Sequence, residues 1–129
     1  MMLLLDTHAF LWFIAGSREL GGTARSLIED PNNVPLLSVA SLREMAIKVS
    51  LGRLSLGQAF DTLIPEQLAL NGIDLLPIKL EHTSAVASLP YRGHRDPFSR
   101  MLAAQAAVEG LPIVSRDSAF EMYRIQRLW

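Results

Sequence analysis

Two aspartates, Asp6 and Asp117, each close a short apolar segment of the chain. Asp6 follows Met2 to Leu5, and Asp117 follows Leu111 to Arg116. Short apolar runs of this kind are typical of buried strands in a parallel sheet, whose ligands bind beyond the carboxyl ends of the strands. A third acid, Glu44, lies at the start of a predicted helix between them. Converging carboxylates raise one another's pKa unless a cation joins them, so the pattern predicts a Mg²⁺ or Mn²⁺ site and favours an enzyme.

Two of these acids also have a purely structural interpretation. Asp6 precedes Thr7 and a predicted helix, and aspartate is among the best helix-capping residues. Glu44 stands after Ser41 at the spacing of a capping box, and before Lys48 at a spacing that favours an ion pair on a helix. These contacts would leave Glu44 on the surface. The residue types alone leave both interpretations open.

The segment from His94 to Ala106 is the most distinctive of the chain. Its Asp96-Pro97 pair combines a favoured N-cap with a favoured first helical residue, so a helix is predicted from here to about Glu109. The arginines around this point are either solvated charges or groups that steer phosphates toward the acids. They are Arg92, Arg95 and Arg100.

A short apolar segment, Phe10 to Ile14, is hydrophobic on every side of a predicted helix. Such a helix usually lies in the core. If part of it is exposed, its aromatic residues would anchor a protein partner, because aromatic side chains are enriched at binding hot spots. The aromatic residues concerned are Phe10, Trp12 and Phe13.

The elements that must position these residues alternate between strand and helix. Strands are predicted at 3–5, 34–37, 73–77, 113–115 and 125–128. Helices are predicted at 8–15, 23–29, from 38 or 41 to 50, and at 56–70, 80–89, 97–109 and 118–122. This alternation predicts an α/β fold, a three-layer α/β/α sandwich with a mainly parallel central sheet, in a single domain spanning residues 1–129.

The composition is that of a folded domain and narrows its chemistry. Half of the 129 residues are hydrophobic and 19% are charged. The lack of cysteine excludes disulfides and thiolate zinc sites and fits a cytoplasmic protein, and the spacing of the three histidines does not favour a histidine-based metal site. With 12 basic and 13 acidic residues, any binding of nucleic acid must come from a local cluster of charge.

The apolar segments do not predict a membrane protein. The longest, Ala9 to Ala15, is far shorter than the ~20 residues that a transmembrane helix needs. The first residues carry no basic segment, and Asp6 interrupts the first apolar run, so a secretory signal is not predicted. We therefore expect no membrane association.

Taken in order, several segments of the chain resemble those of PIN-domain nucleases, in particular the VapC-like toxins of bacterial toxin–antitoxin pairs. The segments are Leu4 to His8, Ser38 to Lys48 with Leu51 to Leu54, His94 to Ala106, Leu111 to Asp117 with Ala119-Phe120, and Leu128-Trp129. Each is weak alone, but together they cover nearly the whole chain. The resemblance implies a metal-dependent endoribonuclease with an α/β/α fold, which forms a homodimer and binds a VapB-like antitoxin.

The resemblance also implies a set of acidic positions that bind Mg²⁺ or Mn²⁺, and Asp6, Glu44 and Asp117 match all but one of them. The remaining position falls in a stretch that the family typically writes Asp-Pro-Phe-Asp-Arg and that reads Asp96 to Arg100 here. Ser99 stands where the second aspartate is expected. A serine hydroxyl can touch a metal but brings no negative charge. Weaker metal binding and weaker RNA cleavage are therefore expected.

Supporting roles follow from the same resemblance. In an intact site the metal polarises a phosphate and lowers the pKa of the attacking water. Thr7 and Ser115 stand beside the strand-end aspartates and are predicted to hold the carboxylates by hydrogen bonds. Asp96 lies one helical turn from Ser99, although its capping role competes with turning toward the metal.

Two alternatives belong to other classes. An aspartate after a first strand also opens haloacid-dehalogenase-like phosphatases and receiver domains. The former need a second aspartate where this chain has His8, and the latter need an acidic pair that the sequence lacks. The other alternative is a catalytically impaired PIN fold that acts as an antitoxin- or RNA-binding module, and Ser99 is the residue that favours it.

Overall fold

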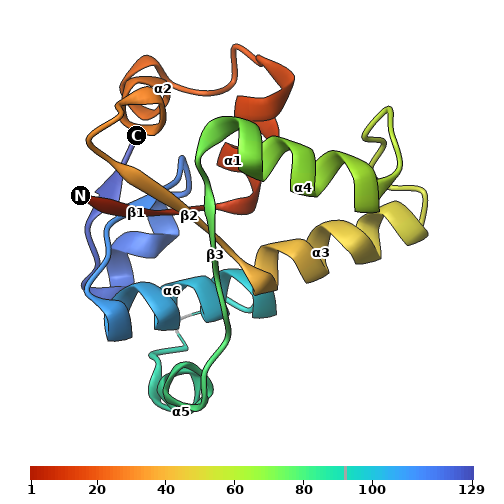
Figure 1. The fold of residues 1–129 in the computed structure, drawn as a ribbon. Coiled ribbons are helices and arrows are strands. Elements are labelled where there is room, and N and C mark those ends of the chain that lie inside the picture. The colour runs from red at the N-terminus through yellow and green to blue at the C-terminus, as the bar shows by residue number, and fades with distance from the viewer. Residues whose placement is uncertain (92) are drawn as a thin grey trace.

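All strands of the central sheet run parallel to their neighbours (Figure 1). The strands are β1 (Met2–Leu5), β2 (Val34–Ser38), β3 (Asp74–Leu76), β4 (Ile113–Val114) and β5 (Arg127–Leu128). In the computed structural model, which describes residues 1–91 and 93–129, they pair in the order β3-β2-β1-β4-β5. β1 is therefore central, and Leu3, Leu4 and Leu5 are completely buried. A strand covered on both faces explains why its sequence is apolar without alternation.

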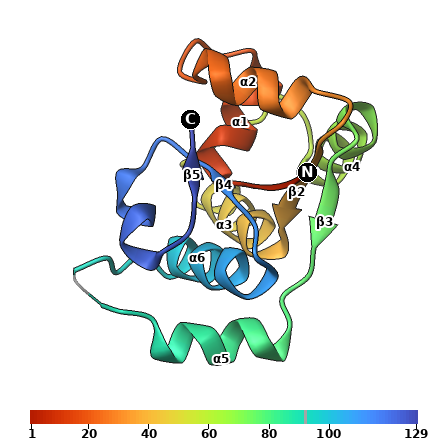
Figure 2. The same ribbon diagram turned by 90° about the vertical axis from the view of Figure 1, so that its left-hand side faces the viewer.

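Helices cover both faces of this sheet. They are α1 (Thr7–Ala15), α2 (Gly22–Glu29), α3 (Val39–Ser50), α4 (Phe60–Asn71), α5 (Leu80–Ser88), α6 (Pro97–Glu109) and the short 3₁₀ helix η1 (Ser118–Tyr123). Helices α1, α2 and α4 lie on one side, and α6 and η1 on the other, with α5 packed on the outside of α6 (Figures 1 and 2). The predicted α/β/α sandwich with a parallel sheet is confirmed.

The two hydrophobic cores follow from the alternation of side chains along β1. Leu3 and Leu5 pack with Phe10 of α1 and with residues of α2 and α4. Leu4 points to the opposite face and packs with Leu102 of α6 and Phe120 of η1. Helix α3 contributes buried residues to both cores at the carboxyl end of the sheet. This end of the sheet is therefore fixed from two sides.

Most predicted boundaries agree with the structure within a few residues, and α4 is the main exception. The predicted helix at 56–70 begins only at Phe60, because residues 56–59 form a loop. The sequence pattern marks Pro65 as a break or restart of this helix, but the helix continues through it. Its missing N–H leaves the carbonyl of Asp61 without a helical donor. Asp61 and Pro65 are both exposed, so this turn of the helix lies on the surface of the protein. Within the described ranges, none of the helices combines the length and the apolar character that crossing a bilayer requires.

Candidate active site at the switch point of the sheet

The carboxyl ends of β1 and β4 lie side by side where the strand order reverses. Leu5 pairs with Val114, so the residues that follow the two strands emerge together. Ligands of open parallel sheets bind at such a switch point. A cavity of about 180 Å³ opens there. It is lined by Asp6, His8, Ala9, Trp12, Arg116 and Asp117. Two of the three predicted catalytic acids therefore share one cavity.

Asp6 is held by hydrogen bonds to both of its carboxylate oxygens. The backbone N–H of Thr7 donates to Oδ1 at 2.9 Å, and the Ser115 hydroxyl donates to Oδ2 at 2.7 Å. Burial raises the pKa of the Asp6 carboxyl above its ordinary value, against the opposing effects of Ser115, Thr7 and the nearby His8. The negative charge of Glu44 raises this pKa further. Asp6 also caps α1, which confirms its structural interpretation, and its role as a metal ligand remains a prediction.

Ser115 connects the two aspartates. Its hydroxyl oxygen accepts a hydrogen bond from the backbone N–H of Asp117 at 3.0 Å, and its O–H donates a hydrogen bond to Asp6. Asp117 is exposed, and its Oδ1 accepts from the backbone N–H of Ala119 at 2.9 Å, which caps η1. One completely buried serine therefore fixes the relative position of both acids.

Glu44 lies on α3, close enough for its charge to raise the pKa of Asp6, but it is not among the residues that line the cavity. Its Oε2 is 2.8 Å from Nζ of Lys48, so the predicted ion pair is present, yet Glu44 is only 7% exposed. The predicted capping box is wrong: Ser38 caps α3, accepting from the N–H of Ala40, and Ser41 lies within the helix. The Ser41 hydroxyl instead accepts a buried bond from Thr7 at 2.8 Å. The hydroxyl of Thr7 thus joins α1 to α3, and only its backbone holds Asp6.

The residue types at this edge fit a hard divalent cation. Carboxylates are the preferred ligands of Mg²⁺ and Mn²⁺, and a cation would offset the burial and repulsion that raise the pKa of Asp6. The side chains do not yet form a complete ligand shell. Among residues 1–91 and 93–129, no three His, Cys, Asp or Glu side chains are close enough together to hold a metal ion. Glu44 in particular is engaged with Lys48.

Ser99 and Asp96 contact each other at the start of α6. The Ser99 hydroxyl donates to Oδ2 of Asp96 at 2.8 Å, and the N–H of Phe98 donates to Oδ1 at 3.2 Å. Both contacts belong to the cap of the helix, as predicted for Asp96. Neither residue is among those that line the cavity with Asp6 in the described structure. Their predicted roles in metal binding remain predictions.

The three arginines that were predicted to contact phosphates are considered separately, because the structure gives each a different status. The prediction that Arg100 contacts a phosphate is wrong. Arg100 is only 9% exposed, and its guanidinium donates to the carbonyls of residues 86, 89, 90 and 94. It holds the fold together and has no free face for RNA. Arg95 is exposed, with its guanidinium 5.9 Å from the ring centroid of Tyr91. Arg92 lies outside the described residues.

The aromatic residues of α1 also have different environments. Phe10 is completely buried in the core, so the prediction that it contacts a partner is wrong. Trp12 and Phe13 are half-buried. Trp12 lines the cavity and packs edge-on against Trp129, with 5.9 Å between ring centroids. Phe13 stacks under Arg25 instead. Both side chains are partly buried against the core, and their predicted contact with a partner remains a prediction.

Two cavity residues, His8 and Arg116, were missed by the sequence reasoning. His8 lowers the pKa of Asp6 and stacks against Trp12. Arg116 stands directly before Asp117, which was the available signal. The arginines around Asp96 form a denser basic cluster in the sequence than Arg116 does.

Replacing Asp6 with asparagine is expected to stabilise the metal-free protein at neutral pH. Because burial raises the pKa of Asp6 in the folded state, the folded protein binds this proton more tightly than the unfolded chain. The ionised carboxylate therefore opposes folding above the folded-state pKa, and the penalty disappears as the pH falls below the ordinary value of 3.8. An asparagine amide can still accept from Thr7 and donate to Ser115.

Urea unfolding in EDTA at about pH 7 and about pH 3.5 measures this effect. Asp74→Asn, at an exposed position of β3, is the control for loss of one carboxylate. A gain equal to that of the control, or one that persists in acid, would contradict the prediction.

Comparisons with known proteins agree with this fold. The model of the PIN domain matches residues 3–126. No curated protein sequence matches the chain significantly. Among solved structures, VapBC2 from Rickettsia felis bound to a DNA fragment from its promoter superposes with a TM-score of 0.72, over 99% of this chain and 98% of its own, at 13% identity.

Two further solved structures are similar over most of their length. VapBC-1 from nontypeable Haemophilus influenzae has a TM-score of 0.67 and 15% identity, over 99% of this chain and 97% of its own. A toxin–antitoxin complex from Klebsiella pneumoniae has a TM-score of 0.60 and 18% identity, over 90% of this chain and 87% of its own. At these identities the likeness establishes the fold.

Proposed function

The chain belongs to the PIN domain family, whose members are generally nucleases, and from this premise we propose that it is a metal-dependent endoribonuclease and the toxin of a toxin–antitoxin pair. The observation that carries the proposal is the pair of aspartates in one cavity at the switch point, joined by Ser115. Glu44 is close enough to raise the pKa of Asp6 and supplies a third acid. We propose the cytoplasm as the place where the protein meets its RNA.

Asp6, Glu44 and Asp117 would hold Mg²⁺ or Mn²⁺, which polarises the scissile phosphate and lowers the pKa of a bound water. Ser115 orients Asp6 and, through its contact with the backbone, Asp117. The N–H of Thr7 fixes the second oxygen of Asp6. Carboxylates held in this way need little reorganisation when a charged substrate arrives. Burial raises the pKa of Asp6, and a bound cation would favour the ionised form of this carboxyl.

Ser99 favours a second candidate, an impaired PIN fold that binds RNA or an antitoxin without efficient cleavage. In the family pattern this position carries a metal-binding aspartate, whereas the Ser99 hydroxyl donates to Asp96 within its own helix cap. The site then has one negative charge fewer than the family pattern implies. We propose that this loss weakens cleavage without abolishing the fold.

An antitoxin partner is supported by the structural neighbours, which are VapBC and toxin–antitoxin complexes, and by a second cavity of about 420 Å³. Its lining is mainly apolar, with Lys48 and Arg53 as its basic members. The lining residues are His8, Leu11, Trp12, Ile14, Ala15, Lys48, Arg53, Leu54, Ser55, Leu56, Leu63 and Gln67. An antitoxin segment with apolar side chains would cover the half-buried side of α1. We also propose a homodimer, which sedimentation of the isolated chain tests.

An RNA cleavage assay tests the proposed function. Single-stranded RNA is incubated with the protein in Mg²⁺, in Mn²⁺ and in EDTA, beside DNA of the same sequence. The Asp6→Asn protein, purified in parallel, detects contaminating nucleases. We expect cleavage of RNA that needs the metal and is lost with Asp6→Asn. If neither the wild-type chain nor Ser99→Asp cuts RNA in either metal, the endoribonuclease assignment is wrong.

A further inference from the structure

Arg116 is the basic residue that lies among the acids of the cavity. Its guanidinium carbon is 4.5 Å from the ring centroid of Trp12, a cation–π distance. Its Nη1 is 2.6 Å from Oε2 of Glu19, which lies in the loop after α1. Both Arg116 and Glu19 are more than half exposed, at 55% and 59% of the side chain. The guanidinium is thus held in one orientation but remains open to solvent.

This arrangement contributes little to the fold. An ion pair between two exposed side chains is worth at most about 1 kcal/mol, and often nothing measurable. Arg116 differs in this respect from Arg100, which is buried under four backbone carbonyls. A cation placed beside Asp6 and Asp117 without a structural need suggests a ligand that carries negative charge.

The geometry favours a phosphate group as that ligand. A guanidinium presents N–H donors in a planar fork that matches the oxygens of carboxylates and phosphates alike. Glu19 therefore occupies the position that a phosphate oxygen would take. The indole of Trp12, which lines the cavity as Arg116 does, contacts the guanidinium and limits its movement.

We propose that Arg116 binds a phosphate of single-stranded RNA beside the acidic site, and that Glu19 is an internal competitor that the phosphate displaces. The proposal rests on the proposed nuclease function and names a residue that contacts its substrate. Glu19 satisfies the guanidinium while the site is empty, so binding exchanges one anion for another. Removing Glu19 should tighten RNA binding, but only while Arg116 is present.

Fluorescence anisotropy with a labelled single-stranded RNA, measured in EDTA at low salt, tests this proposal without any cleavage. We expect Arg116→Ala to weaken binding about fivefold to tenfold and to reduce the salt dependence by about one phosphate contact. Arg116→Lys should retain part of the affinity. Glu19→Gln should strengthen binding about twofold or more, because the competing charge is lost.

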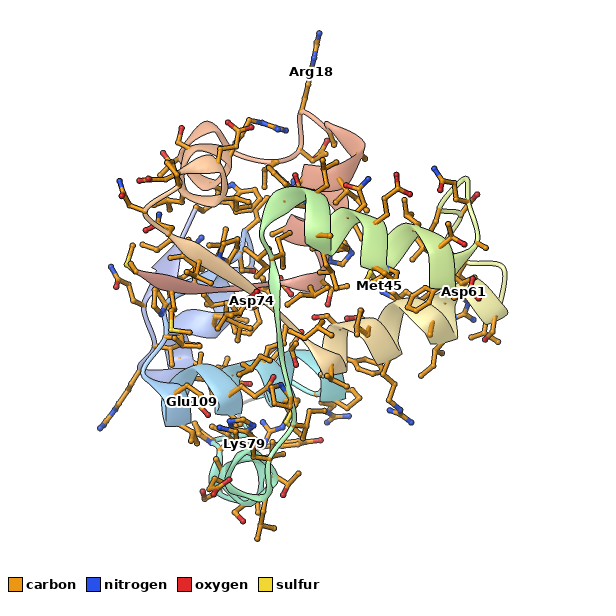
Figure 3. All side chains as sticks on the ribbon, viewed as in Figure 1. Arg18, Met45, Asp61, Asp74, Lys79 and Glu109 are labelled. Carbon is orange, nitrogen blue, oxygen red and sulfur yellow. The ribbon has the colours of Figure 1, made fainter. Side chains whose placement is uncertain are left out.

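Arg18→Ala is the matched control for loss of one positive charge, because Arg18 lies in the same loop as Glu19 but points away from the molecule (Figure 3). It should leave affinity nearly unchanged. Equal losses for Arg18→Ala and Arg116→Ala would overturn the proposal, since only total charge would then matter. So would a gain from Glu19→Gln that persists in the Arg116→Ala background.

These outcomes separate the proposal from the nuclease assignment. If the chain binds RNA through Arg116 but neither it nor Ser99→Asp cleaves, only the nuclease assignment fails. If RNA is cleaved while Arg116→Ala binds it as tightly as the wild type, only the role of Arg116 fails. Circular dichroism of each variant confirms that the fold is retained.

Discussion

Replacing Ser99 with aspartate is expected to raise RNA cleavage about tenfold or more and to tighten the binding of Mg²⁺ or Mn²⁺, because the affinity of hard-cation sites depends on the number of charged ligands. Ser99 lies in the first turn of α6, where the helix N-terminus favours negative charge. The new carboxylate cannot donate to Asp96 as the hydroxyl does, and its repulsion from Asp96 would drive it away from the cap. A cation would then stabilise it.

Calorimetric titration with Mn²⁺ and initial cleavage rates measure the two effects. Thr23→Asp is the matched control, because Thr23 is exposed and the substitution adds the same charge to the first turn of α2, outside the site. We also expect Ser99→Asp to be harder to express without an antitoxin. If the substitution changes neither metal binding nor cleavage, Ser99 does not occupy the metal-ligand position, and the alignment of this segment with the family is wrong.

Replacing Arg100 with methionine is expected to lower the free energy of unfolding by about 3 kcal/mol, because four partly buried carbonyls would lose a charged donor. The guanidinium donates to the carbonyls of Val86, Leu89, Pro90 and His94 at 3.0–3.5 Å. Those of Val86 and Leu89 lie at the C-terminal end of α5, where a helix favours positive charge. Methionine replaces the apolar stem of the side chain but none of these bonds.

Thermal and urea unfolding of the metal-free protein measure the loss, which should lower Tm by roughly 10 °C. Arg95→Met is the matched control, because Arg95 is exposed and lies in the same segment. It should change stability by less than about 0.5 kcal/mol. A loss below about 1 kcal/mol for Arg100→Met would show that water replaces the guanidinium without cost.

The fold and the acids at the strand ends could be predicted from the sequence, because the local apolar pattern of a strand determines where that strand lies in the fold. Leu3, Leu4 and Leu5 are apolar without alternation, which is typical of a strand covered on both faces. β1 is the central strand of the sheet, and all three leucines are completely buried. A polar residue directly after such a strand must lie at the edge of the sheet. Asp6 is in that position whatever the details of packing.

The environments of Glu44 and Arg100 could not be read in the same way. The ion pair of Glu44 with Lys48 is local, because helical spacing sets it, and it was predicted. The burial of Glu44 depends on how α3 packs beside α1, which no local pattern encodes. Arg100 resembles a solvated charge beside Asp96, since the carbonyls that surround it become neighbours only when α5 and the following loop fold against α6.

The order of the strands has a consequence for the synthesis of the protein. β1 is the first of the described strands to be made, whereas β4, one of its two neighbours in the sheet, is made only after α6. Asp6 and the Ser115 that orients it are 109 residues apart in the chain. A nascent chain on the ribosome therefore carries Asp6 without its hydrogen-bond partner or the second aspartate until residues 115–117 have been made. The two acids can come together only after that segment has left the exit tunnel, so a nascent chain that has not reached it holds no assembled site.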